Sequence, residues 1–225
     1  TDKRNGRQQY VYLANFDWYN YLYDDSRPTW DHNINIKGGT KALSYMVSGR
    51  YYQQKGVNRI EPDMFKSYNF RVKLQAEIKP WLTIASNTKF FQSNYKYYGY
   101  EDEYNNFRKP TLHALASFVP VNPDGTAVSH TSVTQSSTHY LMDGYNAMMQ
   151  KGKSFGNKKT QEITTTFEAT FKLHRNFNVK ADFSYTQGYL HNDYRSVNVQ
   201  YSQYPGEVMT CLLYTSPSPR DTERS

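Results

Sequence analysis

Cysteine is almost absent from this chain of 225 residues, since Cys211 is the single one. It lies in the last fifteen residues, so the chain before it offers no disulfide, thiolate metal site or catalytic thiol. Long apolar runs are also missing. No stretch approaches the roughly 18–20 apolar residues of a spanning helix, and the mean hydropathy is −0.87. These absences exclude a helical membrane protein.

Signatures of catalysis are missing as well. The sequence contains no Gly-x-Ser-x-Gly element, no phosphate-binding Walker loop and no Gly-rich dinucleotide turn. Its six histidines show no metal-ligand spacing. A hydrolase with paired carboxylates needs two acids that converge on a cleft, whereas Glu101, Asp102 and Glu103 form one charge run. We therefore predict that the chain is not an enzyme and has no catalytic residue, metal or cofactor.

Apolar and polar residues instead alternate in three hairpins. Alternation with period 2 places successive side chains on opposite faces of a strand. The three hairpins, each with its expected turn, are residues 30–51 around 38–40, 70–90 around 79–81, and 163–189 around 174–176. Arms of about ten residues exceed the about 5–6 of soluble strands and match the about 9–11 that cross a bilayer. The pattern predicts six long membrane strands.

The connections between hairpins are much longer than the turns within them. They comprise a medium loop over about residues 53–66 and a very long one over about residues 94–159. Short turns that alternate with long loops are typical of outer-membrane β-barrels, whose periplasmic turns are short and external loops long. A soluble antiparallel sheet also alternates, but it has no reason to keep every second connection short. We predict an all-β fold, an antiparallel transmembrane β-barrel segment.

Tyrosine is abundant, with 22 residues against three tryptophans. Amphipathic rings gather where a membrane meets water, although aromatic residues also favour strands in general. The candidates for such a belt at the strand ends are Trp30, Tyr51, Tyr52, Trp81, Phe90, Phe91, Tyr95 and Tyr189.

The net charge of +7 raises the question of nucleic acid. The basic residues are scattered along the polar strand faces and mixed with acids such as Glu77, Glu168 and Asp182. This distribution suits a solvated lumen wall better than a binding stripe. We predict no nucleic-acid partner.

Residues 211–221 resemble the in-frame translation of a sequencing-library adapter, so we expect 211–225 to be an artefactual tail. A genuine Ser/Pro linker is the alternative. The chain begins at Thr1 without Met or a signal sequence, and we expect its natural N-terminus to lie further upstream.

A series of short motifs resembles the SusC/RagA family of TonB-linked outer-membrane transporters. It runs over about residues 10–95 in the family's order: Asn-Phe-Asp-Trp at 15–18, a His-Asn strand reaching Gly-Gly-Thr at 32–40, a Tyr-to-Gln-x-Gly stretch at 45–56, Phe-Lys-Ser-Tyr-Asn-Phe-Arg at 65–71, and Lys-Pro-Trp-Leu at 79–82. Lys37 and Ser67 depart from the family's usual Ser and Arg. The motif residues are Asp17, Trp18, His32, Asn33, Gly38, Gly39, Gly49, Gly56, Phe65, Tyr68, Asn69 and Arg71.

The resemblance implies a barrel of about 22 strands that holds a plug, in the outer membrane of a Gram-negative bacterium. It implies a SusD-like surface lipoprotein as lid, TonB as energy source acting through a plug that is not recognisable here, outer-membrane lipid around the barrel, and an oligosaccharide or peptide substrate. Residues 1–29 would lead into the barrel and residues 30–210 would form part of it.

Ligand contacts are expected at the start of the long external loop. Tyrosine rings stack on sugars and acids bind hydroxyl groups, so the candidates are Tyr95, Tyr97, Tyr98, Tyr100, Glu101 and Asp102. The alternative is that these tyrosines anchor the barrel rim or contact the lid.

A soluble or surface β-sheet module, such as a carbohydrate-binding sandwich or an adhesin, remains the competing interpretation. The strand faces distinguish the two. A transporter barrel leaves Phe167, Phe171, Phe177 and Phe183 without a second sheet over them, whereas a sandwich buries them between two sheets.

Overall fold

The computed structural model describes residues 2–4, 6–99, 114–128, 144, 154–197, 200–202 and 204–210. The expected tail at 211–225 and three of the ligand candidates, Tyr100, Glu101 and Asp102, lie outside these residues.

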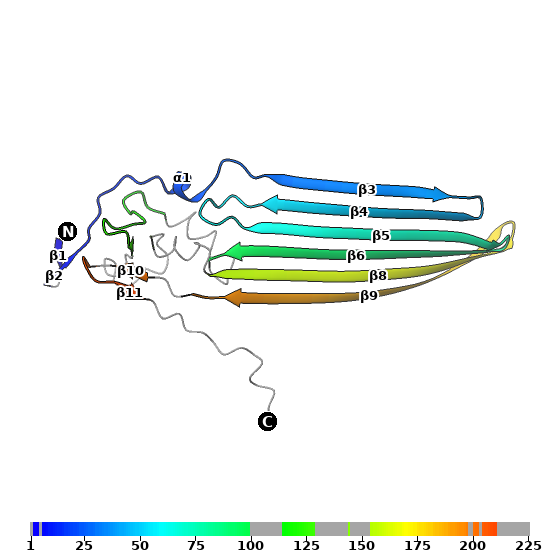
Figure 1. The fold of residues 1–225 in the computed structure, drawn as a ribbon. Helices are drawn as coiled ribbons and strands as arrows, with labels where there is room; N and C mark the ends of the chain where they lie inside the picture. Colours follow the sequence, from blue (N-terminus) through cyan, green and yellow to red (C-terminus); the bar gives the residue numbers. More distant parts are fainter. Residues whose placement is uncertain are drawn as a thin grey trace, which may run out of the picture.

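Six long strands form one antiparallel sheet (Figure 1). They are β3 Thr29–Gly39, β4 Leu43–Lys55, β5 Met64–Lys79, β6 Leu82–Tyr98, β8 Phe155–His174 and β9 Phe177–Arg195. Their order in the sheet is β3-β4-β5-β6-β8-β9, so each strand pairs with its neighbour in sequence among these six. The sheet is open, with β3 and β9 at its edges. The predicted all-β barrel-segment fold and its six strands are confirmed.

The first hairpin turn is shifted from its predicted place. We expected a turn at residues 38–40, but β3 continues through Gly39, which pairs with Ser44. The turn is Thr40–Ala42, where the Thr40 Oγ1 accepts hydrogen bonds from the backbone N–H groups of Ala42 and Leu43 at 3.3 and 3.2 Å. The threonine hydroxyl stabilises the turn, and Gly39 is needed because a Cβ there would lie 2.2 Å from the Leu43 carbonyl oxygen.

The strands run further toward the long loops than the sequence predicted. The medium loop is residues 56–63 rather than 53–66, since β4 ends at Lys55 and β5 begins at Met64. Likewise β6 continues to Tyr98 and pairs there with Phe155. Tyr95, Tyr97 and Tyr98 therefore lie in a strand and not in the external loop. The alternation was undetectable in this region because both faces of the sheet are polar or aromatic.

The register divides the sheet into an apolar and a polar face. We call "apolar band" the part of the apolar face between the hairpin turns and Tyr51: Ile34, Ile36, Val47, Phe70, Val72, Leu74, Ile78, Ile84, Phe90, Ile163, Phe167, Phe171, Val179 and Phe183, with the small or polar residues between them. Many of these side chains are exposed to solvent, with exposed fractions of 53% for Phe167 and 65% for Phe183. Among the described residues no second sheet covers them, which is the arrangement of a barrel wall and not of a sandwich.

Aromatic residues mark the end of the apolar band. Tyr51 and Tyr189 lie on the apolar face at this level, and Trp30 lies on the same face one row nearer the long loops. The Tyr51 ring packs against Tyr68 with centroids 5.2 Å apart. Three other belt candidates, Tyr52, Phe91 and Tyr95, lie on the polar face. Period-2 geometry turns every second residue away from the belt, so the prediction was wrong for these three.

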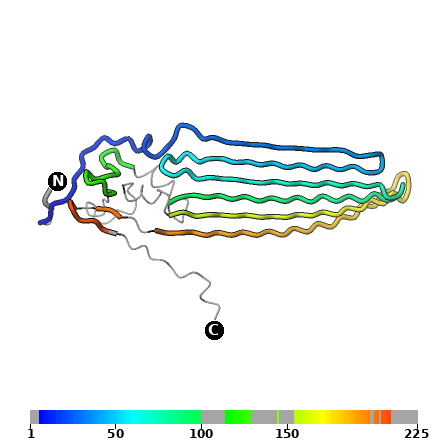
Figure 2. The backbone as a smooth tube through the Cα atoms, viewed as in Figure 1, coloured from blue at the N-terminus to red at the C-terminus, as the bar shows by residue number. Residues whose placement is uncertain are grey.

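The remaining elements gather at the loop end of the sheet (Figures 1 and 2). They are β1 Asp2–Arg4, β2 Arg7–Gln9, α1 Trp18–Leu22, β7 Ala127–Val128, β10 Gln200–Ser202 and β11 Met209–Thr210. Trp18 and Leu22 form the small core there. None of the helices in the described part of the chain is long and apolar enough to cross a membrane.

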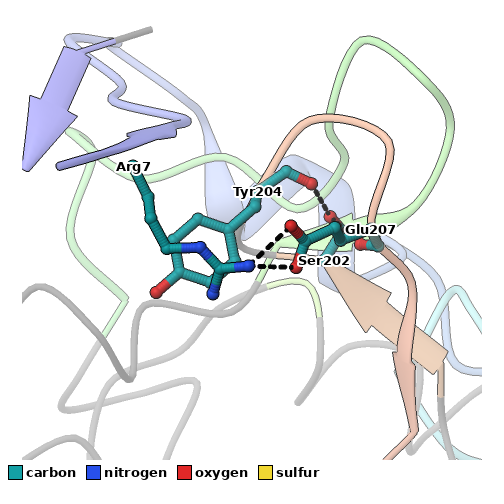
Figure 3. A network of polar contacts seen from close by, with 4 residues as sticks. All are labelled: Arg7, Ser202, Tyr204 and Glu207. Atoms are coloured by element: carbon teal, nitrogen blue, oxygen red, sulfur yellow. Dashed lines mark hydrogen bonds and ion pairs between the residues drawn. The ribbon is translucent and has the colours of Figure 1, made fainter.

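Polar contacts tie segments far apart in sequence together at this end. Figure 3 shows Arg7 Nη2 donating to both carboxylate oxygens of Glu207, at 2.7 and 3.0 Å. The Arg7 guanidinium also lies over the Tyr204 ring, 4.6 Å from its centroid. The Ser202 hydroxyl donates a hydrogen bond to the backbone carbonyl oxygen of Glu207 at 2.6 Å. These contacts hold β2 against the turn that follows β10.

Candidate ligand-binding wall

Aromatic and charged side chains gather on the polar face near the loop end of the sheet. Phe65 of β5, Tyr95 of β6 and Lys158 of β8 occupy one register row, so their side chains lie side by side across three strands. Tyr52 lies one row toward the turns, with its ring 6.2 Å from that of Phe65. We call these residues, together with Tyr97, the polar-face aromatic cluster.

Tyr95 and Tyr97 form a stacked pair within β6, with ring centroids 5.5 Å apart and planes inclined at 25°. They lie on the same face because they are two residues apart. Tyr97 is only 5% exposed, and its ring lies across Gly156, where a Cβ would come within 2.2 Å of the ring. Tyr97 therefore supports the neighbouring ring, and Tyr95 presents the more accessible surface.

Hydrogen bonds and cations orient the cluster. The Tyr95 hydroxyl donates to Asp63 Oδ2 at 3.2 Å, which fixes the ring against the loop that precedes β5. Lys158 Nζ lies 5.8 Å from the centroid of the Tyr97 ring. On the neighbouring strands, Arg50 donates to both carboxylate oxygens of Asp31 at 2.8 and 2.7 Å. The surface thus combines a ring face with acceptors and donors, as a sugar or a peptide backbone would require.

The other ligand candidates are placed differently. Tyr98 lies on the opposite face of β6 from Tyr95 and Tyr97, where Lys96 Nζ is 5.2 Å from its ring centroid. The structure brings Tyr95 and Tyr97 together, separates Tyr98 from them, and does not describe Tyr100, Glu101 or Asp102.

Asp17 and Trp18 of the motif series organise helix α1. Asp17 is its N-cap, and its Oδ1 accepts the backbone N–H of Asn20 at 3.0 Å. This bond and a second one from the Asn20 side chain lower the pKa of the Asp17 carboxyl. Trp18 is buried and its Nε1 donates to the Leu115 carbonyl oxygen at 3.0 Å. Trp18 thereby joins α1 to a segment almost a hundred residues away.

The other motif residues lie in the strands of the sheet or next to its turns. His32, Tyr51 and Tyr68 lie in successive strands, with the His32 and Tyr51 rings stacked at 6.4 Å. Arg71 Nε donates to Asn87 Oδ1 at 2.8 Å across to β6. The remaining positions lie in the strands or next to the turns: Asn33 and Asn69 on the polar face, Phe65 in the aromatic cluster, Gly38 under the Tyr45 ring, Gly39 beside the turn, Gly49 in the apolar band, and Gly56 at the end of β4 against Asp63.

The Asn-Pro-Asp-Gly segment forms the turn that its composition indicates. The Gly125 N–H donates to the Asn122 carbonyl oxygen at 2.9 Å, and Asp124 accepts from the Tyr10 hydroxyl at 2.9 Å. Tyr12 donates to the Asn122 side chain. Burial, followed by the proximity of Tyr10 and Asp124, raises the pKa of Tyr12 to about 12.

The sequence analysis did not identify three residues that lie against the polar-face aromatic cluster: Asp63, Lys158 and Gly156. A glycine inside a strand often marks a close approach, so Gly156 carried a usable signal. Asp63 and Lys158 carried none, because only the strand register brings them to Tyr95 and Tyr97. Within the described ranges, no group of three or more His, Cys, Asp or Glu side chains is placed to hold a metal ion.

Comparison with known proteins gives structural relatives only. No family model and no curated protein matches the chain. The RagAB peptide importer in its "open-open" state is similar with a TM-score of 0.62 at 20% identity, over 87% of this chain and 22% of that one. The "closed-closed" state gives 0.55 at 18% identity over 80% and 20%, and a structure of the RagAB peptide transporter gives 0.54 at 19% over 76% and 19%.

The chain spans about a fifth of the length of these solved chains. Likeness at this identity establishes the fold: the chain has the fold of a segment of these transport proteins.

Proposed function

We propose that this chain is part of the barrel wall of an outer-membrane, TonB-dependent transporter of the SusC/RagA type. The observation that carries the proposal is the single-layered sheet, with an exposed apolar band on one face and charged and hydroxyl side chains on the other. This division of the two faces fits a barrel wall that contacts lipid on one side and an aqueous lumen on the other.

The height of the apolar band supports the proposal. On β5 it runs from Phe70 to Ile78, about 30 Å of strand at about 3.3 Å per residue. At a strand tilt of about 40° this distance covers about 23 Å along the membrane normal, close to the roughly 25 Å band of outer-membrane barrels. The open edges at β3 and β9 would be completed by further strands of a larger barrel, about 22 in all, because unpaired backbone groups are costly in lipid.

The motif series and the fold together favour this family. RagAB is a peptide importer, and the family resemblance adds oligosaccharides as substrates. The proposed partners are a SusD-like lipoprotein over the loop end, TonB acting through a plug, and the surrounding outer-membrane lipid.

The proposed ligand contact is Tyr95. Its ring faces the lumen in this arrangement, and Asp63 and Lys158 place an acceptor and a donor beside it. Tyr97 has a supporting role because it is buried.

The first test recovers the complete gene from the DNA that encodes this chain and follows its product. In a cysteine-free background, Phe167→Cys on the apolar face and Thr166→Cys on the polar face form a matched pair of adjacent residues. We expect the full-length protein in the outer-membrane fraction, with a lipid-soluble thiol reagent labelling the Phe167→Cys variant and a water-soluble one labelling the Thr166→Cys variant. A soluble product, or the reverse labelling, would refute the barrel assignment.

The second test concerns transport. Deleting the gene should abolish growth on the oligosaccharide or peptide that the transporter imports, identified by screening both classes. Tyr95→Leu should reduce uptake, whereas Tyr98→Leu on the opposite face should leave it unchanged. Equal uptake by the Tyr95→Leu variant and the wild type would remove Tyr95 from the ligand site.

A further inference from the structure

The apolar face changes character abruptly at the register row that holds the aromatic residues Tyr51, Tyr68 and Tyr189. Between the hairpin turns and this level, the described strands place no Lys, Arg, Asp or Glu on that face. Beyond it, the same face carries a group of basic side chains that we call the basic belt: Lys55, Lys66, Lys96, Lys159, His191 and Arg195.

Three members of the basic belt lie in one register row. Lys66 pairs with Asn94, Asn94 with Lys159, and Lys159 with His191. Lys66 and Lys159 are thus two strands apart, about 10 Å at the backbone, with Asn94 between them. Among the described residues neither lysine forms an ion pair. Both are half-buried.

Among the described strand residues on this part of the face, Asp193 is the one acidic side chain. That carboxylate accepts from Asn157 Nδ2 at 3.2 Å and lies 3.5 Å from His191 Nε2. On the polar face, Arg50 is paired with Asp31 nearer the hairpin turns, and Lys158 lies at the level of the belt, 5.8 Å from the Tyr97 ring centroid.

The side chain of Asn94 has an unsatisfied acceptor among the described residues. Its Oδ1 is covered from solvent but has no hydrogen-bond partner among the described residues. A buried acceptor without a donor is costly. In the register row, Asn94 lies between Lys66 and Lys159.

We propose that the basic belt binds the phosphate groups of the outer-leaflet lipid, with Lys66 and Lys159 holding one phosphate between them. The inference rests on the proposed function, because the apolar band must face lipid for the belt to meet headgroups. The apolar band matches the acyl chains of that leaflet, the aromatic rings match its interface, and the cations just beyond match its phosphates.

The test uses the full-length transporter, purified in a nonionic detergent and stripped of lipid. The probes are lipid A carrying two phosphates, the same lipid A with its phosphates removed, and inorganic phosphate. The test variant is Lys66→Gln/Lys159→Gln. Its control is Lys73→Gln/Lys89→Gln, which removes the same charge from the polar face.

Each interfacial lysine contributes about 1 kcal/mol of attraction to an anionic lipid surface, so the Lys66/Lys159 variant should bind phosphorylated lipid A about thirtyfold more weakly. The Lys73/Lys89 variant should bind like the wild type, and removing the lipid phosphates should weaken wild-type binding to the level of the Lys66/Lys159 variant. Equal loss in both double variants, or unchanged binding of dephosphorylated lipid A, would overturn the proposal. Displacement of the lipid by inorganic phosphate at similar concentration would also overturn it, by indicating a site for free anions.

The labelling of the Phe167→Cys and Thr166→Cys variants separates the two levels of failure. If the lipid-soluble reagent does not reach the Phe167→Cys variant, the barrel assignment and the basic belt fall together. If it does and the Lys66/Lys159 variant still binds like the wild type, only the belt is refuted.

Discussion

Replacing Leu74 by arginine tests whether the apolar band contacts lipid. Leu74 lies near the middle of the band on β5, an interior strand of the sheet, and is 47% exposed. Its neighbour Gln75 faces the other side, is exposed, and has no side-chain hydrogen bond or ion pair among the described residues, so Gln75→Arg is a matched control.

The expected effect is large and has a definite sign. An arginine on the lipid face near the bilayer midplane costs about 2–4 kcal/mol, whereas one on the lumen side costs little. The Leu74→Arg variant should therefore lower the folding equilibrium constant by about 30- to 900-fold. If the apolar face contacted water instead, the change would replace an exposed leucine by a charge and leave stability within about 0.5 kcal/mol.

The assay is reversible unfolding of the full-length protein in short-chain lipid vesicles by guanidinium, followed by the slower gel migration of the unfolded barrel. The Gln75→Arg variant should retain the wild-type midpoint. Equal midpoints for the Leu74→Arg variant and the wild type would refute the lipid-facing assignment, as would a larger loss in the Gln75→Arg variant.

Three further changes test local features. Gly39→Ala should destabilise the first hairpin by about 1–3 kcal/mol, because the added Cβ meets backbone; Gly49→Ala, with ordinary contacts only, should cost less in the same unfolding assay. Gly156→Ala should displace the Tyr97 ring and reduce uptake, unlike Gly49→Ala, and unchanged uptake would separate the ring pair from transport. The lowered pKa of Asp17 means that its N-cap stabilises α1 above about pH 4 and loses that effect as the pH falls through the lowered value. Hydrogen exchange of α1, corrected for intrinsic rates, should then increase on acidification in the wild type but change little in an Asp17→Ala variant, and equal changes in both would contradict the capping role.

The sequence predicted the parts of the fold that depend on local alternation. Residues 163–173 and 177–185 alternate so regularly that strand length, face and turn follow from the backbone geometry alone. The same signal failed near the loop end, at Tyr95 and Tyr97, because beyond the aromatic boundary neither face is apolar and period 2 leaves no trace in composition. The structure, not the pattern, showed that β6 continues to Tyr98.

The sequence by itself determined that this is a sheet of six long strands with one apolar face, because each strand's side chains alternate wherever the strand pairs. The tertiary structure decided which residues share a row: Tyr95 beside Lys158, Tyr97 over Gly156, and Lys66 two strands from Lys159. Register between strands depends on pairing across loops of very different length. Neither the 56 residues between β6 and β8 (99–154) nor the composition of the strands specifies that pairing locally, so the polar-face aromatic cluster and the basic belt became visible only in the folded chain.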